Sequence, residues 1–417
     1  MSREQEDGSA PRLALVLSGG GARGAYEVGV LSYLFDELQA ARGRPFAVDI
    51  ICGTSVGAVN AAHLAAHIAD PKDGSRRLVK LWSELKLDSV LGFGLKQAAS
   101  LTGFFKTDSA QGLVDIGPMA KFIRQQIPWR KITRSMREGH LRALTISCTE
   151  VLTGRTVQFT QTGPNTGTPS QPGPRALIRP CRIGPQHVLA SASIPLVFPP
   201  VRVGKQLYID GGLRQNTPVS PALRFGATHV LCVGTYLEEQ GVVLQDQKDE
   251  PTTSYVIGKI MDALLLDHLS NDVAQVRMIN DLLQSGIEAF GPDFLHRLNE
   301  AAAQRGGRLL QPTNLMMISP STALGQLGAE YLKNHTVRSR SRLTRKLLEW
   351  LDSGSEADLA SYLLFEGDFA LQLIELGRSD ARAARDRLLS FLDEIPESSP
   401  PQGGADEMPT FAAPAVG

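Results

Sequence analysis

Three short motifs in this 417-residue sequence contain residue types that can carry out acyl transfer. The first is the G-x-S-x-G motif formed by Gly53, Thr54, Ser55, Val56 and Gly57, which lies between an apolar run, residues 48–52, and a helical pattern, residues 58–68. A serine on a tight strand-to-helix turn needs small neighbours, because its hydroxyl projects from a strained backbone. This context predicts Ser55 as a nucleophile, although glycine-bounded serines also occur in ordinary turns.

The second motif is the glycine loop formed by Gly19, Gly20, Gly21, Ala22, Arg23 and Gly24, which follows the apolar run 13–17. It matches the dinucleotide fingerprint G-x-G-x-x-G, which requires an acidic residue about 20 positions later, at the end of the next strand. That strand leads into Gly53 and Ser55 instead, which disfavours a nucleotide site. The alternative is that successive backbone N–H groups hold an oxyanion beside the serine. Arg23 would fix the loop or add positive potential.

The third motif, Asp210-Gly211-Gly212, follows the apolar residues 207–209. Alone it is typical of an Asp-Gly turn. All three motifs follow predicted strands, however, and open α/β folds place their sites at the carboxyl ends of strands. We therefore expect Asp210 to lie beside Ser55 as its base. An ordinary carboxylate, with a pKa of about 3.9, is a poor base at neutral pH, and desolvation beside Ile209 and Val197 would raise that pKa.

The elements that must position these motifs alternate between strand and helix, which predicts a doubly wound, largely parallel sheet in an α/β fold. Unbroken apolar runs indicate strands that are buried on both faces. The predicted strands are residues 13–17, 48–52, 144–148, 156–160, 206–209, 230–233 and 315–318. The predicted helices are residues 25–38, 58–68, 115–127, 255–283, 341–351 and 368–376. Residues 161–174, rich in Gly, Pro and Thr, are predicted to form a loop.

In this order, the motifs GGGARG, GTSVG and DGG resemble those of the patatin-like phospholipase family, over about residues 12–236. The resemblance implies Ser55 as nucleophile, Asp210 as base, and no cofactor. It also implies an oxyanion hole formed by the backbone of the glycine loop, Gly19 to Gly24. Ser18 stands where many family members have glycine or aspartate, a difference that leaves the glycine loop intact.

The resemblance and the composition divide the chain into four parts. We expect a polar N-terminal segment at 1–11, a catalytic α/β domain at 12–236, a mainly helical C-terminal region at 237–395, and a disordered proline-rich tail at 396–417.

Charge and composition exclude several classes of partner and location. Lys plus Arg and Asp plus Glu both number 43, so no overall field favours nucleic acid. The polar N-terminus lacks the character of a signal peptide, and four widely spaced cysteines are expected to be reduced thiols. We therefore expect a cytoplasmic protein whose membrane contact is at most peripheral.

Several other residues allow a functional and a structural interpretation. His63 and His67 have a spacing that can bind zinc, but no glutamate follows His63, so H-E-x-x-H fails and we expect no metal site. His187 is a candidate third catalytic residue. His229 begins a predicted strand, away from the carboxyl ends, so we expect no histidine to reach Ser55. Phe104 and Phe105 form either a buried flap or a lid that enters lipid.

Together the sequence predicts a lipid acyl hydrolase that cleaves phospholipid or lysophospholipid esters through a Ser-Asp dyad and an acyl-serine intermediate. Two other classes remain open at this point. One is a dinucleotide-binding protein that uses the glycine loop. The other is a non-catalytic lipid-binding or scaffold protein.

Overall fold

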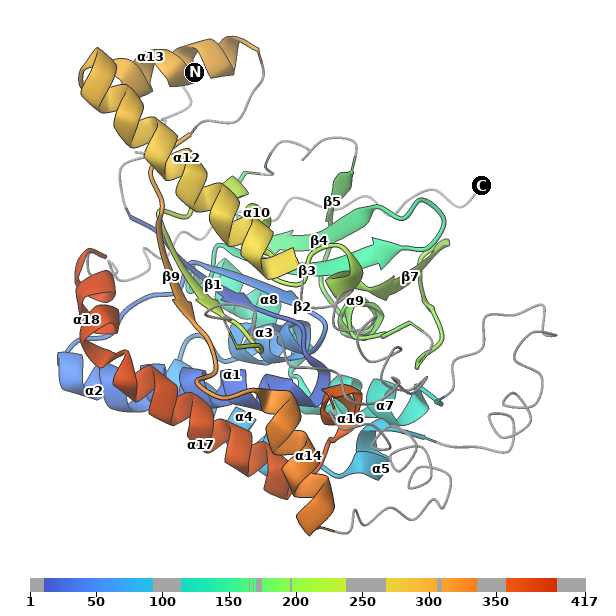
Figure 1. The fold of residues 1–417 in the computed structure, drawn as a ribbon. Coiled ribbons are helices and arrows are strands. Elements are labelled where there is room, and N and C mark those ends of the chain that lie inside the picture. The colour runs from blue at the N-terminus through green and yellow to red at the C-terminus, as the bar shows by residue number, and fades with distance from the viewer. Residues whose placement is uncertain are drawn as a thin grey trace, which may run out of the picture.

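The computed structural model describes residues 11–92, 114–164, 166–167, 169, 175–195, 197–237, 268–305, 310–335 and 358–395. Its centre is a nine-stranded sheet with the order β5-β4-β3-β2-β1-β8-β9, to which β6 and β7 are attached beside β3. Strands β3, β2, β1, β8 and β9 are parallel to one another. Helices lie on both faces of the sheet (Figure 1). The predicted largely parallel α/β architecture is confirmed.

The strands of this sheet include all seven predicted from the apolar runs, with small shifts at their ends. They are β1 (Leu13–Leu17), β2 (Ile50–Thr54), β3 (Ala143–Glu150), β4 (Thr156–Thr162), β5 (Ala176–Pro180), β6 (Val201–Val203), β7 (Gln206–Asp210), β8 (His229–Val233) and β9 (Asn314–Ile318). Strand β1 shows why such runs are unbroken. Leu13, Leu15 and Leu17 pack into the larger core on one face, whereas Ala14 and Val16 pack into a smaller core on the other.

The N-terminal helices include α1 (Ala25–Ser32), which continues through a π-helical segment (Tyr33–Leu38) into α2 (Gln39–Arg42). Those that follow before β8 are α3 (Val56–Ala66), α4 (Pro71–Ser83), α5 (Leu87–Val90), α7 (Gly117–Gln126), α8 (Trp129–Arg137), α9 (Pro185–Ser191) and α10 (Val219–Arg224). The predicted helix 58–68 begins two residues earlier, directly after Ser55. The Phe104 and Phe105 flap or lid lies outside the described residues.

The C-terminal region is mainly helical, as predicted. It contains α12 (His268–Phe290), α13 (Phe294–Gln304), α14 (Leu324–Asn334), α16 (Asp358–Leu363), α17 (Gly367–Ala383) and α18 (Arg385–Asp393). Helix α17 is longer than the predicted 368–376, because its buried face continues on the small residues Gly377 and Ala381. Three predicted segments lie outside the described residues: the helix 341–351, the first part of the helix 255–283, and the tail 396–417.

Strand β7 runs antiparallel to its neighbour β3, whereas the sequence predicts largely parallel strands. This direction determines where Asp210 lies. Strand β7 pairs with the end of β3, where Asp210 lies opposite Cys148. Strand β2 pairs parallel with the preceding part of β3, where Thr54 lies opposite Ser147. Because β4 occupies the other side of β3 up to Thr149, β2 and β7 must lie on the same side. Their carboxyl ends therefore meet head to head, so Asp210 approaches Ser55 from the opposite direction to that expected.

The C-terminal region packs closely against the rest of the chain. Strand β9 pairs with β8, and α17 runs along α1 beneath the sheet (Figure 1). Two glycines allow these helices to approach. A Cβ atom at Gly29 would lie 2.0 Å from the carbonyl oxygen of Ile374, and one at Gly377 would lie 2.2 Å from that of Tyr26.

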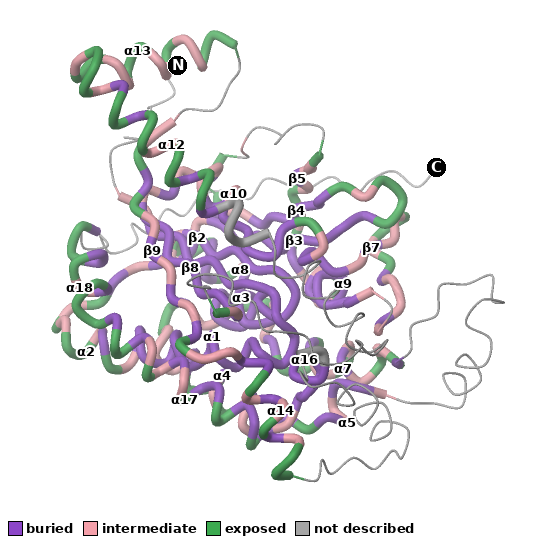
Figure 2. The backbone as a smooth tube through the Cα atoms, in the orientation of Figure 1, coloured by how far each residue is buried: buried purple, intermediate pink, exposed green. Residues whose placement is uncertain are grey.

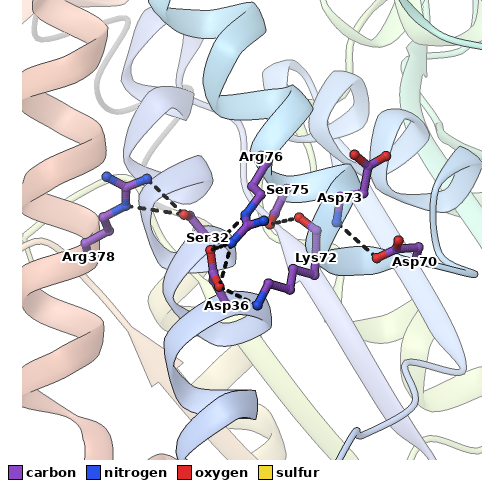
Figure 3. A network of polar contacts seen from close by, with 8 residues as sticks. All are labelled: Ser32, Asp36, Asp70, Lys72, Asp73, Ser75, Arg76 and Arg378. Atoms are coloured by element: carbon purple, nitrogen blue, oxygen red, sulfur yellow. Dashed lines mark hydrogen bonds and ion pairs between the residues drawn. The ribbon is translucent and has the colours of Figure 1, made fainter.

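Polar contacts join α17 and α4 to the α1 helix and its π-helical continuation (Figure 3). Arg378 donates to the hydroxyl of Ser32 at 3.0 Å, while Lys72 and Arg76 both pair with Asp36. These ion pairs are partly exposed, so each contributes at most about 1 kcal/mol. The apolar packing beneath them is the main stabilising contribution.

Burial is concentrated in the sheet and in the helices that carry the motifs. Figure 2 shows α1, α3 and the central strands as buried, whereas α12 and α13 form an arm with many exposed residues. All four cysteines are free thiols: Cys52, Cys148 and Cys232 are buried, whereas Cys181 is half-buried. Among the described residues, no helix has both the length and the apolarity needed to cross a bilayer.

The contact between α1 and α17 generates a first prediction. We expect Gly29→Ala to lower the free energy of unfolding by about 1–3 kcal/mol, because the new methyl group would overlap the Ile374 carbonyl. Guanidinium denaturation of both proteins measures the difference. Gly184→Ala is the matched control, because no atom lies within 4 Å of the methyl position there. An unchanged or increased stability for Gly29→Ala, as helix propensity alone would give, would contradict the close helix contact.

Candidate active site

Ser55 occupies a sharp turn between β2 and α3. Its backbone angles are φ 55 and ψ −126, and among the described residues it is the one non-glycine with positive φ. The turn is tight enough to require its flanking glycines. A Cβ atom at Gly53 would lie 2.4 Å from the carbonyl oxygen of Gly57, and one at Gly57 would lie 2.5 Å from that of Leu17. Such strain is typical of a serine whose hydroxyl is presented at the end of a strand.

The Ser55 hydroxyl donates a hydrogen bond to Asp210, with 2.6 Å between Oγ and Oδ2. Asp210 is fully buried, and its other oxygen accepts a hydrogen bond from the Gly212 N–H at 2.7 Å. Gly211 permits this approach, because a Cβ atom there would lie 2.3 Å from the Ser147 carbonyl oxygen. The head-to-head strands β2 and β7 thus bring two of the three motifs into direct contact.

The surroundings of Asp210 make its carboxylate more basic than usual. Burial raises the pKa of Asp210 to about 7, against the opposing effect of the hydrogen bonds from Ser55 and Gly212. This is the direction that the sequence analysis anticipated. A carboxylate whose pKa lies near neutral pH can both take up and release a proton.

The glycine loop lies beside Ser55, where a Cβ atom at Gly19 would be 3.0 Å from the Ser55 Cβ. The Gly19 N–H donates to the Asn216 carbonyl at 3.2 Å, and the Gly19 carbonyl accepts from Thr235 at 2.6 Å. Because the N–H and C=O of a trans peptide point in opposite directions, this anchoring turns the Gly20 N–H away from Thr235. Within the described residues, the N–H groups of Gly20 and Gly21 have no acceptor.

Arg23 holds the glycine loop against the C-terminal region. Its side chain is buried, donates from Nε to the Ser361 hydroxyl at 2.8 Å, and lies 3.9 Å above the Tyr362 ring. A cation over an aromatic face is stabilising, particularly when desolvated. Of the two roles considered for Arg23, the geometry favours fixing the loop.

Ser191 is a site residue that the sequence analysis missed. Its hydroxyl accepts the backbone N–H of Ser55 at 2.9 Å and donates to the Ser147 carbonyl at 2.6 Å. It therefore links the strained turn to β3. The neighbouring Ser193 carbonyl accepts the Asp210 N–H at 2.9 Å. Two serines in the apolar stretch Ala190–Ile194 were the only sequence signal for this role.

An apolar pocket that is partly open to solvent lies at Ser55. Ser55 and Gly21 lie in its wall together. The other lining residues are Val56, Val59, Leu81, Trp82, Leu85, Val90, Met119, Phe122, Ile123, Ala192, Ile194, Phe198 and Phe365. The lining is apolar and holds few polar groups.

The two histidines considered as catalytic partners are engaged elsewhere. His187 accepts the Gly184 N–H through Nδ1 at 3.0 Å, and its Nε2 lies 3.6 Å from the sulfur of Cys181. His229 Nε2 lies 3.3 Å from a Glu394 carboxylate oxygen. The Ser55 hydroxyl is instead bonded to Asp210.

His63 and His67 stack on each other within α3, with ring centroids 4.5 Å apart. Burial lowers the pKa of His63 to about 4, so the ring is neutral at physiological pH. Across the described part of the chain, no three His, Cys, Asp or Glu side chains lie close enough together to hold a metal ion. The pair contributes to packing between α3 and the start of α4, where His63 Nε2 lies 3.3 Å from the Gly74 carbonyl.

The chain is similar in sequence to one protein family and to several known proteins. A family model described as patatin-like phospholipase matches residues 15–223. An uncharacterised NTE family protein of Mycobacterium tuberculosis is 29% identical over 236 residues, which is 56% of this chain and 51% of that protein. A cGAMP-activated phospholipase of Pseudomonas aeruginosa is 32% identical over 222 residues, 49% of this chain and 53% of that protein.

The chain spans about half the length of these curated relatives. Among solved structures, human GIVD cytosolic phospholipase A2 is similar over 95% of this chain and 64% of that chain, at 11% identity and a TM-score of 0.42. The ExoU–SpcU complex of Pseudomonas aeruginosa is similar at 15% identity and a TM-score of 0.26, over 85% of this chain and 70% of the matched chain. At these TM-scores the likenesses carry no conclusion about activity.

The burial of Asp210 predicts a pH dependence of stability. Its folded-state pKa of about 7 lies above the ordinary unfolded value of about 3.9, so the folded protein binds the proton more tightly. Asp210 therefore favours folding below about pH 4, and this contribution is lost as the pH rises to 7. At full slope the loss is about 1.4 kcal/mol per pH unit.

We expect Asp210→Asn, which cannot ionise, to be more stable than the native protein at pH 7.5 and to lose less stability between pH 5 and pH 7.5. Denaturant titrations of both proteins at the two pH values measure this difference. The comparison cancels other buried acids, including Glu27, whose pKa is raised to about 8 by burial. Identical pH slopes for the two proteins would show that Asp210 titrates normally.

Proposed function

This chain belongs to the patatin-like phospholipase family, and from that premise we propose that it hydrolyses carboxylic esters of phospholipids or lysophospholipids. The reaction uses Ser55 as nucleophile and Asp210 as base. The observation that carries the proposal is the 2.6 Å hydrogen bond between these side chains, made at the wall of an apolar pocket that suits an acyl chain.

The first half of the reaction forms an acyl-enzyme. Ser55 Oγ attacks the ester carbonyl carbon, and its proton passes to Asp210 Oδ2. The negative charge that develops on the carbonyl oxygen is met by the N–H groups of Gly20 and Gly21, which have no acceptor among the described residues. When the carbon–oxygen bond to the leaving alcohol breaks, Asp210 returns the proton to that oxygen.

The second half releases the fatty acid. Water attacks the acyl carbon of the Ser55 ester while Asp210 takes one of its protons. The bond from Ser55 Oγ to the acyl carbon then breaks, and the proton returns from Asp210 to the serine oxygen. A pKa of about 7 suits Asp210 to both roles, because it exchanges the proton in each direction near neutral pH.

The two competing classes fit the geometry less well. A dinucleotide site needs open space at the glycine loop, but a Cβ atom at Gly21 would lie only 2.2 Å from the Tyr362 carbonyl. A purely lipid-binding protein would have no need for a strained serine bonded to a buried aspartate, since both features cost stability. Strain of this kind is kept where it serves catalysis.

We expect Ser55→Ala and Asp210→Asn each to reduce ester hydrolysis to near background, and the double variant to be no slower than either single one. The two side chains act in the same steps, so their losses are not additive. Hydrolysis of p-nitrophenyl butyrate and of mixed phospholipid micelles gives the rates, and an alkyl fluorophosphonate labels the working nucleophile. Full labelling of Ser55→Ala would show that another residue is the nucleophile.

We expect His187→Ala and His229→Ala each to keep activity within about tenfold of the native enzyme, because neither ring contacts Ser55 or Asp210. Loss of a true general base would cost about 10⁴-fold. The same butyrate assay, with circular dichroism to verify folding, distinguishes the two outcomes. A collapse of activity in a folded variant would replace the dyad with a triad in which Asp210 orients the histidine.

A further inference from the structure

One part of the pocket wall comes from outside the segment that matches the family. Of the residues that line the pocket, all but Phe365 lie within residues 15–223. Phe365 follows α16 and is 9% exposed. The C-terminal region therefore contributes a large aromatic ring to the pocket that opens at Ser55.

Contacts of Phe365 and of the two residues after it hold this segment against residues 82–87. The Phe365 ring stacks near that of Trp82, with centroids 6.3 Å apart. The next two residues bond to the same stretch of chain, because the Glu366 carboxylate accepts the Leu87 N–H at 3.1 Å and the Gly367 N–H donates to the Leu85 carbonyl at 2.9 Å. These bonds fix the backbone next to Phe365, and its ring packs in the pocket wall beside Trp82.

Buried hydrogen bonds hold the side chain of Trp82, the residue beside the Phe365 ring, in place. Its indole N–H donates to Asn60 Oδ1 at 3.1 Å, and the Asn60 amide donates to Glu27 at 2.8 Å and to the Gly24 carbonyl at 3.1 Å. All of these side chains are buried. A displaced Trp82 would leave buried polar atoms unpaired, which costs about 1–3 kcal/mol.

We propose that Phe365 is a specificity-determining residue, whose ring limits the length of the acyl chain that the pocket accepts. This inference rests on the proposed function, because it assigns the pocket to the acyl group of the substrate. Removing the ring opens space that is continuous with the pocket, and a longer hydrocarbon chain gains contacts there. Enlarging the ring removes space and excludes chains that now fit.

The test compares Phe365→Ala and Phe365→Trp with the native enzyme on p-nitrophenyl esters from butyrate to palmitate. We expect the ratio of kcat/KM for palmitate over butyrate to rise by about tenfold or more in Phe365→Ala and to fall in Phe365→Trp. Butyrate hydrolysis should change less than palmitate hydrolysis, because a longer chain occupies more of the pocket. Opposite shifts in the two variants are the signature of a steric limit.

Phe369→Ala is the matched control. This phenylalanine is also buried in the C-terminal region, but it packs against Tyr331, with centroids 5.4 Å apart, and does not line the pocket. It should lose stability comparable to that of Phe365→Ala and keep the native chain-length profile. An equal shift in Phe369→Ala, or no shift in either Phe365 variant, would overturn the inference.

A binding assay separates this inference from the proposed function. Displacement of a fluorescent fatty acid by octanoic to stearic acid reports the chain length that the pocket holds without any turnover. If the native protein hydrolyses no ester, the proposed function fails, and the binding profile still decides the role of Phe365. We expect Phe365→Ala to shift that profile toward longer acids, and an unchanged profile would contradict the steric limit.

Discussion

The hydrogen bond between Ser55 and Asp210 depends on a single feature of the sheet, the meeting of two strands on one side of β3. Strand β2 pairs with β3 as far as Ser147, and β7 pairs from Cys148 onward. Because the two run in opposite directions, their carboxyl ends are adjacent. If β7 ran parallel to β2, its first residue would lie here and Asp210 would be carried about 13 Å along the strand, at about 3.3 Å per residue. An antiparallel addition to a parallel sheet therefore creates the site.

This junction leaves so little space that it dictates the residue types around it. Gly53, Gly57 and Gly211 are each within 2.5 Å of backbone oxygen at the position a Cβ atom would take. The strained Ser55 backbone costs about 1–3 kcal/mol, and the buried Asp210 carboxylate adds a further cost above neutral pH. Ser191 offsets part of this by bonding the Ser55 N–H to β3. The remainder is offset by the apolar core packed on both faces of β1 and β2.

Apolar runs and glycine motifs were sufficient to predict most strands of the sheet, the turn at Ser55, and Asp210 as the acid beside Ser55. The direction of β7 was not predictable, because a short apolar run looks the same whether its strand is parallel or antiparallel. Strands β5 and β6 were missed for other reasons. The run Ala176–Pro180 is only partly buried and includes Arg179 and Pro180, while β6 has three residues. Ser191 was missed because a buried serine in an apolar stretch has no periodic pattern.

The contacts of the C-terminal region were the hardest to predict from the sequence, because helical periodicity reveals the apolar face of a helix but not the element that packs against it. Arg23 and Ser361 are 338 positions apart, yet this contact and the packing of Gly21 on Tyr362 help to hold the glycine loop, whose N–H groups are the proposed oxyanion hole. An oxyanion hole stabilises charge only when its donors are held in place before the reaction begins. The segment that matches the family contains the serine, the aspartate and the glycine loop, but residues 358–367 supply further contacts that hold this loop and one residue of the pocket wall. The chemistry of the site is thus local to the sheet junction, while its preorganisation belongs to the whole fold.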